Sequence, residues 1–125
     1  MPTIYGYYYV RDDQAATPDA PGGELINDEA DEGSFSVAAD TDSAQVQVTV
    51  RTLQAAPERA SGDWDRTAET ELVSSSGQVY VCEWGAGPVD DLPNLAASGP
   101  GAYMIRVHSR KRSDTEEHLI EVWPS

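Results

Sequence analysis

Apolar and polar residues alternate along much of this chain, a pattern that is typical of β-strands with one buried face. The clearest run covers residues 44–53, where alanine and valine occupy the even positions through Val50 and polar residues occupy the odd positions through Arg51. Because successive strand residues point to opposite faces, we expect Val46, Val48 and Val50 to face a core. No segment of the sequence keeps the i, i+3, i+4 spacing of a long amphipathic helix.

Other segments favour strands or the loops between them. Residues 4–10 are rich in tyrosine and aliphatic residues and end at a charged turn. The sequence predicts further strands at 35–37, 64–73 and 78–84, and connecting loops at 54–63 and 85–101. Ser74–Gly77 is the predicted hairpin loop between the last two runs, with glycine supplying a positive φ. One helical turn is expected at 91–95, inside the long loop.

The end of the chain predicts a hairpin whose register follows from the sequence. With 111–116 as its loop, the opposed pairs are Val107–Ile120, Ile105–Val122, Met104–Trp123, Arg106–Glu121 and Arg110–Glu117. A shift by one residue would place Arg106 opposite Ile120 and mix the two faces, so the pattern itself selects the register. We therefore expect Arg106 and Glu121 to form a cross-strand structural pair rather than a catalytic couple.

Length and composition favour one folded domain. A chain of 125 residues can bury about two-thirds of its unfolded surface around one core, and 39% hydrophobic residues is too many for wholesale disorder. About seven strands separated by turns predict an all-β fold, an antiparallel β-sandwich that spans residues 1–125 as a single domain. Residues 11–34 contain several Pro and Gly residues and are expected to form a long acidic loop region.

The charge of the chain is strongly negative and unevenly placed. Asp and Glu number 22 against 8 Lys and Arg, for a formal net charge of −14 at pH 7. Such a surface repels nucleic acid, whose binding depends on clusters of Lys and Arg, and it repels anionic membranes. One segment without Lys or Arg holds many of the acids, namely Asp12, Asp13, Asp19, Glu24, Asp28, Glu29, Asp31, Glu32, Asp40 and Asp42. We expect a basic protein as its partner.

The sequence shows no signal for export or membrane insertion. Its start has neither the basic region nor the apolar run of a signal peptide, and no apolar run reaches the roughly 18 residues of a membrane span. Cys82 is the only cysteine, which excludes an internal disulfide. The preference for Arg over Lys, with abundant Ala, Asp and Gly, is typical of GC-rich bacterial genomes. We expect a cytoplasmic bacterial protein.

Candidate catalytic and metal-binding patterns are incomplete. His108 and His118 fall on opposite faces of the predicted hairpin, so they are not placed to share a zinc ion. A calcium-like loop beginning at Asp28 has Ala30 and Ala39 at its third and twelfth positions, where oxygen ligands are needed, although an adventitious calcium ion stays an open question. The sequence has no G-x-S-x-G elbow and no glycine-rich phosphate motif. We therefore expect no enzyme activity, no catalytic residues, no cofactor and no dedicated metal site.

Candidate residues for partner binding come from the acidic segment and from the tyrosine-rich start. Tyrosine is favoured in protein interfaces, and a strand with tyrosine on both faces cannot bury every hydroxyl. The predicted partner-binding residues are Asp12, Asp13, Asp28, Glu29, Asp31, Glu32, Tyr7 and Tyr9.

The C-terminal half resembles a group of small proteins. Residues 101–110 and 116–124 fit the pattern G-x-Y-x-x-R-V-H-x-R, a short charged loop, and then E-x-x-L-I-x-x-W-P. This pattern resembles the ends of small β-sandwich proteins from GC-rich bacteria. Those proteins are remotely similar to inhibitors of the DNA-uptake nucleases of competence systems and to immunity proteins encoded beside toxins. The resemblance implies a β-sandwich and assigns no active-site residue to this chain.

Three functions agree with these observations. The first is a non-enzymatic acidic binding protein that inhibits a basic partner by occlusion, as an immunity protein or as an inhibitor of a nuclease or another toxin. The second is a DNA-mimic or anti-defence protein of a mobile element, which would present the same acidity to a DNA-binding protein. The third is a structural or small-ligand-binding β-sandwich, whose acidity serves solubility alone. The identity of the partner and the oligomeric state stay open at this point.

Overall fold

A computed structural model describes most of the chain, namely residues 3–5, 7–18, 25–38, 45–57, 64–83, 87–89, 91–112 and 115–125. Within these ranges the chain is all-β and forms ten strands. None of the described residues belongs to a helix that is long and apolar enough to cross a membrane. The strands are β1 (Thr3–Tyr5), β2 (Tyr8–Asp12), β3 (Ile26–Asp31), β4 (Ser34–Val37), β5 (Gln45–Thr52), β6 (Arg66–Ser74), β7 (Val79–Glu83), β8 (Gly87–Pro88), β9 (Gly101–Arg112) and β10 (Thr115–Pro124).

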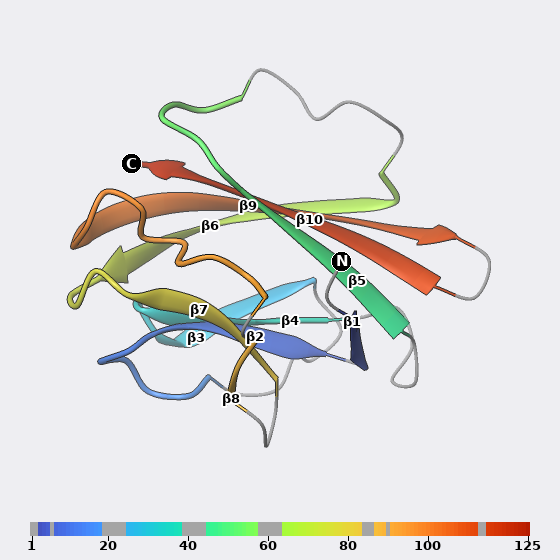
Figure 1. The fold of residues 1–125 in the computed structure, drawn as a ribbon, viewed down its shortest axis with the longest axis horizontal. Helices are drawn as coiled ribbons and strands as arrows, with labels where there is room; N and C mark the ends of the chain where they lie inside the picture. Colours follow the sequence, from blue (N-terminus) through green and yellow to red (C-terminus); the bar gives the residue numbers. More distant parts are fainter. Residues whose placement is uncertain are drawn as a thin grey trace.

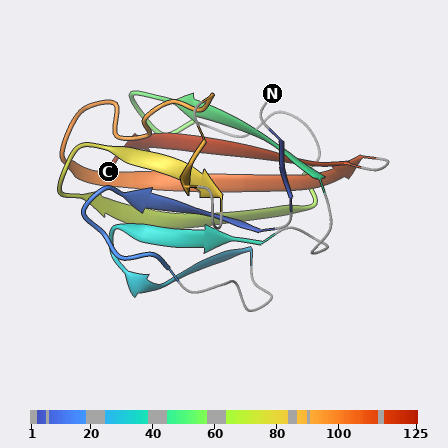
Figure 2. The same ribbon diagram turned by 60° about the horizontal axis from the view of Figure 1, so that its bottom comes forward.

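Two five-stranded sheets lie one over the other, which confirms the predicted β-sandwich (Figure 1). Sheet A has the order β1-β5-β10-β9-β6, and sheet B has the order β3-β4-β2-β7-β8. Figure 2 shows the same two layers after a turn of 60°. Among the described strands, β5 and β10 pair in parallel, whereas the prediction was an antiparallel sandwich. Alternation within one strand says nothing about the direction of its neighbour, which explains the difference.

The tyrosine-rich start of the chain is divided between the two sheets. One strand was expected over residues 4–10, but β1 pairs with β5 in sheet A and β2 pairs with β4 and β7 in sheet B. The expected helical turn at 91–95 is also absent from this described segment. Instead, the backbone amide of Leu95 donates to the carbonyl of Val79 at 2.8 Å, and the side-chain oxygen of Asn94 accepts from the amide of Val79 at 2.8 Å. The loop thus completes the edge of β7.

The region expected to be a long acidic loop contains regular structure. β3 lies within it and forms a hairpin with β4, which is the strand predicted at 35–37; Ile26 lies opposite Val37 and Asn27 opposite Ser36. Residues 19–24 and 39–44 lie outside the described residues. β3 is rich in Asp and Asn, which are poor strand formers, so the sequence alone did not favour a strand there.

The C-terminal hairpin has the predicted register. Val107 lies opposite Ile120, Ile105 opposite Val122, Met104 opposite Trp123, Arg106 opposite Glu121 and Arg110 opposite Glu117. The predicted side-chain pair between Arg106 and Glu121 is wrong, however. Arg106 also lies opposite Glu69 of β6 in the register and forms its ion pair there, with Nε 2.6 Å from Oε1. Glu121 instead contacts His108.

The core lies between the sheets. Val46 and Val48 of β5 are completely buried in it, as their alternation predicted. The other core residues of the two sheets are Tyr8, Val10, Phe35, Val37, Leu72, Val79, Val81, Tyr103, Ile105, Val107, Ile120 and Val122.

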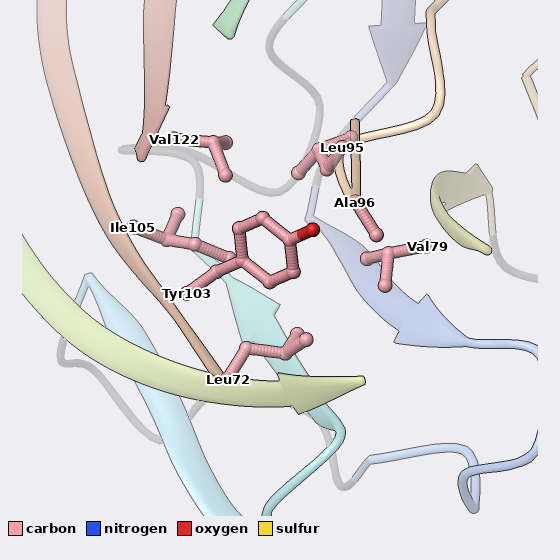
Figure 3. A pocket seen from close by; sticks show the side chains of 7 residues that line it. All are labelled: Leu72, Val79, Leu95, Ala96, Tyr103, Ile105 and Val122. Carbon is pink, nitrogen blue, oxygen red and sulfur yellow. The ribbon is translucent and has the colours of Figure 1, made fainter. Parts of the chain in front are cut away.

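Residues 91–100 close one end of this core. Leu95 and Ala96 pack beside Tyr103 and are buried with it (Figure 3). The Tyr103 hydroxyl donates to the carbonyl of Gly99 at 2.6 Å and accepts from the amide of Ser98 at 3.0 Å. The side chains shown in Figure 3 leave no space for a water molecule between them. This region is therefore packed core and not a ligand cavity.

Candidate protein-binding surface

The fold separates the charges of the chain by sheet. The strands of sheet A contain Arg51, Arg66, Arg106, Arg110, Lys111 and Arg112 beside Glu69, Glu71, Glu116, Glu117 and Glu121, and are close to neutral. The strands of sheet B contain Arg11 alone among basic residues, beside Asp12, Asp28, Glu29, Asp31 and Glu83. Asp13 and Glu32 directly follow β2 and β3 and add to this charge. Sheet B is thus the anionic side of the sandwich.

Asp12 lies at the end of β2 and is only 1% exposed. Its Oδ1 accepts hydrogen bonds from the hydroxyls of Ser74 at 2.6 Å and Ser76 at 2.9 Å. Its Oδ2 accepts from the backbone amide of Gln14 at 2.8 Å. Burial raises the pKa of Asp12, but the hydrogen bonds from Ser74, Gln14 and Ser76 outweigh it and lower the pKa below its ordinary value.

This carboxylate is therefore a structural group. It joins the end of β2 in sheet B to the end of β6 in sheet A, through Ser74, and to the loop that follows β6, through Ser76. Because the side chain is enclosed by its own hydrogen-bond donors, Asp12 is not accessible to a protein partner. We remove it from the candidate binding residues.

The other predicted residues lie in the strands of sheet B or directly beside them in the chain. Asp13 and Glu32 are exposed. Tyr7 is 37% exposed and is the one large hydrophobic side chain classed as exposed among the described residues. Asp28, Glu29 and Asp31 belong to β3, but their side chains lie outside the described part. The backbone carbonyl of Glu32 accepts from the amide of Val73 at 2.9 Å and fixes the β3–β4 turn against β6.

A cavity of about 110 Å³ opens on the outer face of sheet B. It brings together two of the predicted residues, Tyr9 and Asp13, with others that the sequence did not indicate. These are Arg11, Tyr80, Cys82, Gly87 and Pro88. The register places Tyr9 opposite Cys82 and Arg11 opposite Tyr80. The pairing of β2 with β7 was not predictable from alternation, so the sequence carried no signal for this group.

The cavity holds no activated nucleophile. Burial raises the pKa of the Cys82 thiol, and burial followed by the neighbouring Cys82 raises the pKa of the Tyr9 hydroxyl. Both groups are neutral at pH 7, whereas a reactive cysteine needs a lowered pKa. The arrangement therefore suits binding rather than covalent chemistry.

The two histidines form separate buried networks on opposite faces of the hairpin, as predicted. On the core face, His118 Nε2 lies 2.5 Å from Glu116 Oε2, and Nδ1 lies 2.8 Å from the hydroxyl of Tyr8. On the outer face, His108 Nε2 lies 2.6 Å from Glu121 Oε1, and its ring stacks on Trp64 with ring centres 5.3 Å apart.

The His118 network lacks the order of a catalytic triad, whereas His108 lies between a hydroxyl and a carboxylate, with Nδ1 3.0 Å from Thr67 Oγ1 and Nε2 2.6 Å from Glu121 Oε1. Tyr8 is completely buried, and both histidines are at least 97% enclosed, with 3% exposure for His108 and 1% for His118. Ser109 donates to Glu116 at 3.3 Å, so the carboxylate lies between the serine and the histidine. A nucleophilic serine would need the histidine in that middle position. Within the described residues, no three His, Cys, Asp or Glu side chains gather in a way that could hold a metal ion.

Comparison with known proteins extends the fold assignment. No family model and no curated protein matches the sequence. The solved structure of ComJ from Bacillus subtilis, described as an inhibitor of the DNA degrading activity of NucA, is similar with a TM-score of 0.69 at 10% identity, over 98% of this chain and 92% of that chain. A second structure, described as crocagin biosynthetic gene J, is similar with a TM-score of 0.67 at 14% identity, over 98% of this chain and 93% of that chain. At these identities the likeness shows a shared fold.

Proposed function

We propose that this chain is a non-enzymatic, cytoplasmic inhibitor that binds a basic nuclease and occludes its active cleft. The observation that carries the proposal is the full-length likeness to ComJ, which is described as a nuclease inhibitor. The acidity of sheet B supports it, because nucleases bind a polyanion and need a positive cleft for it. The same reasoning extends to other toxins with a positive cleft, for which the chain would act as an immunity protein.

The proposed mechanism is electrostatic capture followed by steric blocking. Carboxylates on sheet B attract the cleft over a distance and speed the encounter. In the complex they occupy the positions that DNA phosphates would take. The residues assigned to this surface are Asp13, Asp28, Glu29, Asp31, Glu32, Tyr7 and Tyr9.

Capture from a lysate of the native host tests the proposal. The tagged chain is used as bait across a salt series, and the eluted proteins are identified by mass spectrometry. The captured nuclease is then assayed for DNA degradation with increasing amounts of the chain. We expect a basic nuclease, stoichiometric inhibition and weaker binding at high salt, because exposed charges are screened within about 8 Å at 0.15 M salt.

A pair of charge-matched variants locates the surface. Neutralising Asp13 and Glu32 (D13N/E32Q) is expected to weaken binding at low salt by at least about tenfold, which equals about 1.4 kcal/mol. Neutralising Glu69 and Glu71 (E69Q/E71Q), two exposed residues of sheet A, removes the same charge and should leave the affinity within about twofold. Equal losses from both pairs, or binding that does not respond to salt, would contradict the assignment to sheet B.

A further inference from the structure

The cavity on sheet B is formed by the outward side chains of two neighbouring strands. In β2, Tyr8 and Val10 belong to the core between the sheets, so Tyr9 and Arg11 point to the other face of sheet B. Tyr9 is largely covered there, at 8% exposure. In β7, Val79 and Val81 belong to the core in the same way. Tyr80 and Cys82 therefore face outward beside Tyr9 and Arg11, and the short strand β8 adds Gly87 and Pro88.

The lining favours an uncharged occupant. The two tyrosine rings, the Cys82 thiol and the Pro88 ring supply apolar surface. Arg11 and Asp13 have opposite charges, so together they select neither a cation nor an anion. The guanidinium of Arg11 also donates to the hydroxyl of Thr17 at 3.4 Å, which directs it toward the loop after β2.

The volume limits the size of this occupant. A closed apolar cavity of about 150 Å³ accepts a benzene ring, and this cavity is smaller, at about 110 Å³. A side chain with four heavy atoms beyond Cα, such as that of leucine or methionine, suits a space of this size. In many interfaces, a few side chains that fill well-packed pockets, surrounded by contacts that exclude water, provide most of the binding energy.

The surroundings indicate which protein would supply that side chain. Cys82 and Tyr9 lie on sheet B. In the strands of this sheet and in the turns directly after them, acidic residues far outnumber basic ones. A partner that covers the cavity must therefore present basic residues around its apolar side chain.

We infer that the cavity receives one aliphatic side chain, of the leucine or methionine class, from the basic protein that covers sheet B. The inference rests on the proposed function, since it names the contact by which that partner is held. It adds a short-range apolar contact to the long-range attraction of the acids.

Small probes test the cavity without the partner. The full chain, labelled with nitrogen-15, is titrated separately with 3-methylbutan-1-ol, n-butylammonium and inorganic phosphate while amide signals are recorded by NMR. We expect saturable shifts with the alcohol at Tyr9, Tyr80 and Cys82, and shifts at least about fivefold smaller with the two ions at equal concentration.

Two variants keep the test independent of folding problems. Cys82→Met extends a side chain from the floor of the cavity, and Pro88→Met extends one from its exposed rim. Both should reduce the affinity for the alcohol at least about tenfold. Cys82→Ala, which leaves the space open, should keep it within about twofold. The spectrum of each variant reports whether it is folded.

The outcomes distinguish this inference from the proposed function. Preferred binding of butylammonium or phosphate, or no saturable binding of any probe, overturns the aliphatic assignment even if the chain inhibits a nuclease. Binding of the alcohol with no nuclease captured leaves the cavity assigned and overturns the proposed function instead.

Discussion

Two adjacent acids, Asp12 and Asp13, have different environments. Asp12 is buried and accepts hydrogen bonds from Ser74, Ser76 and Gln14, whereas Asp13 is exposed at the rim of the cavity. Both belong to the same acidic segment, and composition treats them alike. Their roles differ because Asp12 is the last residue of β2 and its side chain is enclosed, whereas Asp13 lies in the turn that follows the strand.

Replacing Asp12 by asparagine is expected to destabilise the protein by about 2 kcal/mol at pH 7, because hydrogen bonds to a charged acceptor contribute about 1.5–3 kcal/mol. The effect should depend on pH. A lowered pKa in the folded state stabilises the protein above the unfolded pKa of about 3.9, and this stabilisation is lost as the pH falls through the folded value. The difference between the wild type and Asp12→Asn should therefore be constant near neutral pH and begin to narrow as the pH falls below about 4. Urea unfolding between pH 7 and 3 measures the difference.

Asp13→Asn is the matched control for this measurement. The substitution removes the same charge one residue away, at an exposed position, and should change the free energy of unfolding by less than about 0.5 kcal/mol. A constant difference between wild type and Asp12→Asn across the pH range would show that the carboxylate contributes no charge-dependent stability.

Strands β2 and β10 are joined by a buried polar contact across the two sheets. The hydroxyl of Tyr8 meets Nδ1 of His118, whose Nε2 faces Glu116. In a neutral imidazole, Nε2–H donates to the carboxylate and Nδ1 accepts from Tyr8. Burial, and then the charge of Glu116, raises the pKa of Tyr8 well above its ordinary value, so the hydroxyl stays protonated. This contact fixes how the two layers are placed relative to one another.

Tyr8→Phe keeps the buried ring and removes only the hydroxyl. We expect a loss of about 1–3 kcal/mol in the free energy of unfolding, because Nδ1 of His118 is left buried without its donor. Tyr80→Phe, on the outer face of sheet B, should cost less than about 0.5 kcal/mol. Chemical denaturation of the two variants and the wild type compares them. Equal effects would mean that the Tyr8–His118 contact adds nothing beyond the packing of the ring.

The whole molecule combines a nearly neutral sheet with an anionic one. The formal net charge of −14 opposes the compact state through self-repulsion. On sheet A, ion pairs between described residues, such as Arg106 with Glu69 and Arg110 with Glu117, offset part of this repulsion. On sheet B the acids greatly outnumber Arg11. Repulsion is therefore concentrated in the layer that we assign to partner binding.

Salt is expected to stabilise the free protein because it screens this repulsion. Raising the ionic strength from 0.01 to 0.15 M shortens the screening length from about 30 to about 8 Å and should raise Tm by roughly 2–5 °C. D13N/E32Q should have a higher Tm than the wild type at low salt and a smaller response to salt. E69Q/E71Q breaks the ion pair of Glu69 with Arg106, so its Tm at low salt should rise less than that of D13N/E32Q. Calorimetry measures all three, and identical salt responses would refute the uneven distribution of repulsion.

The strands with clear alternation could be predicted, since a local period of two residues is enough to define them. β5, β6, β7 and the C-terminal hairpin lie within one or two residues of their predicted bounds, and the paired positions of Ile105 and Val122 follow from matching faces. The predicted hairpin between β6 and β7 is wrong, because β6 pairs with β9 in sheet A and β7 pairs with β2 in sheet B. The acidity of the N-terminal third was also readable, because it depends on composition alone. The burial of Asp12 was not, since its two serine donors, Ser74 and Ser76, lie some sixty positions later in the chain.

Local alternation and composition thus determined an acidic all-β chain with a defined terminal hairpin. The pairing of distant strands decided on which sheet the acidic residues lie and which side chains meet there. The division of residues 4–10 between two sheets, the parallel contact of β5 with β10 and the meeting of Tyr9 with Cys82 all depend on strands that are distant in sequence. The physical reason is that side-chain alternation has a period of two in every strand, so it specifies which face is buried but not which strand becomes the neighbour.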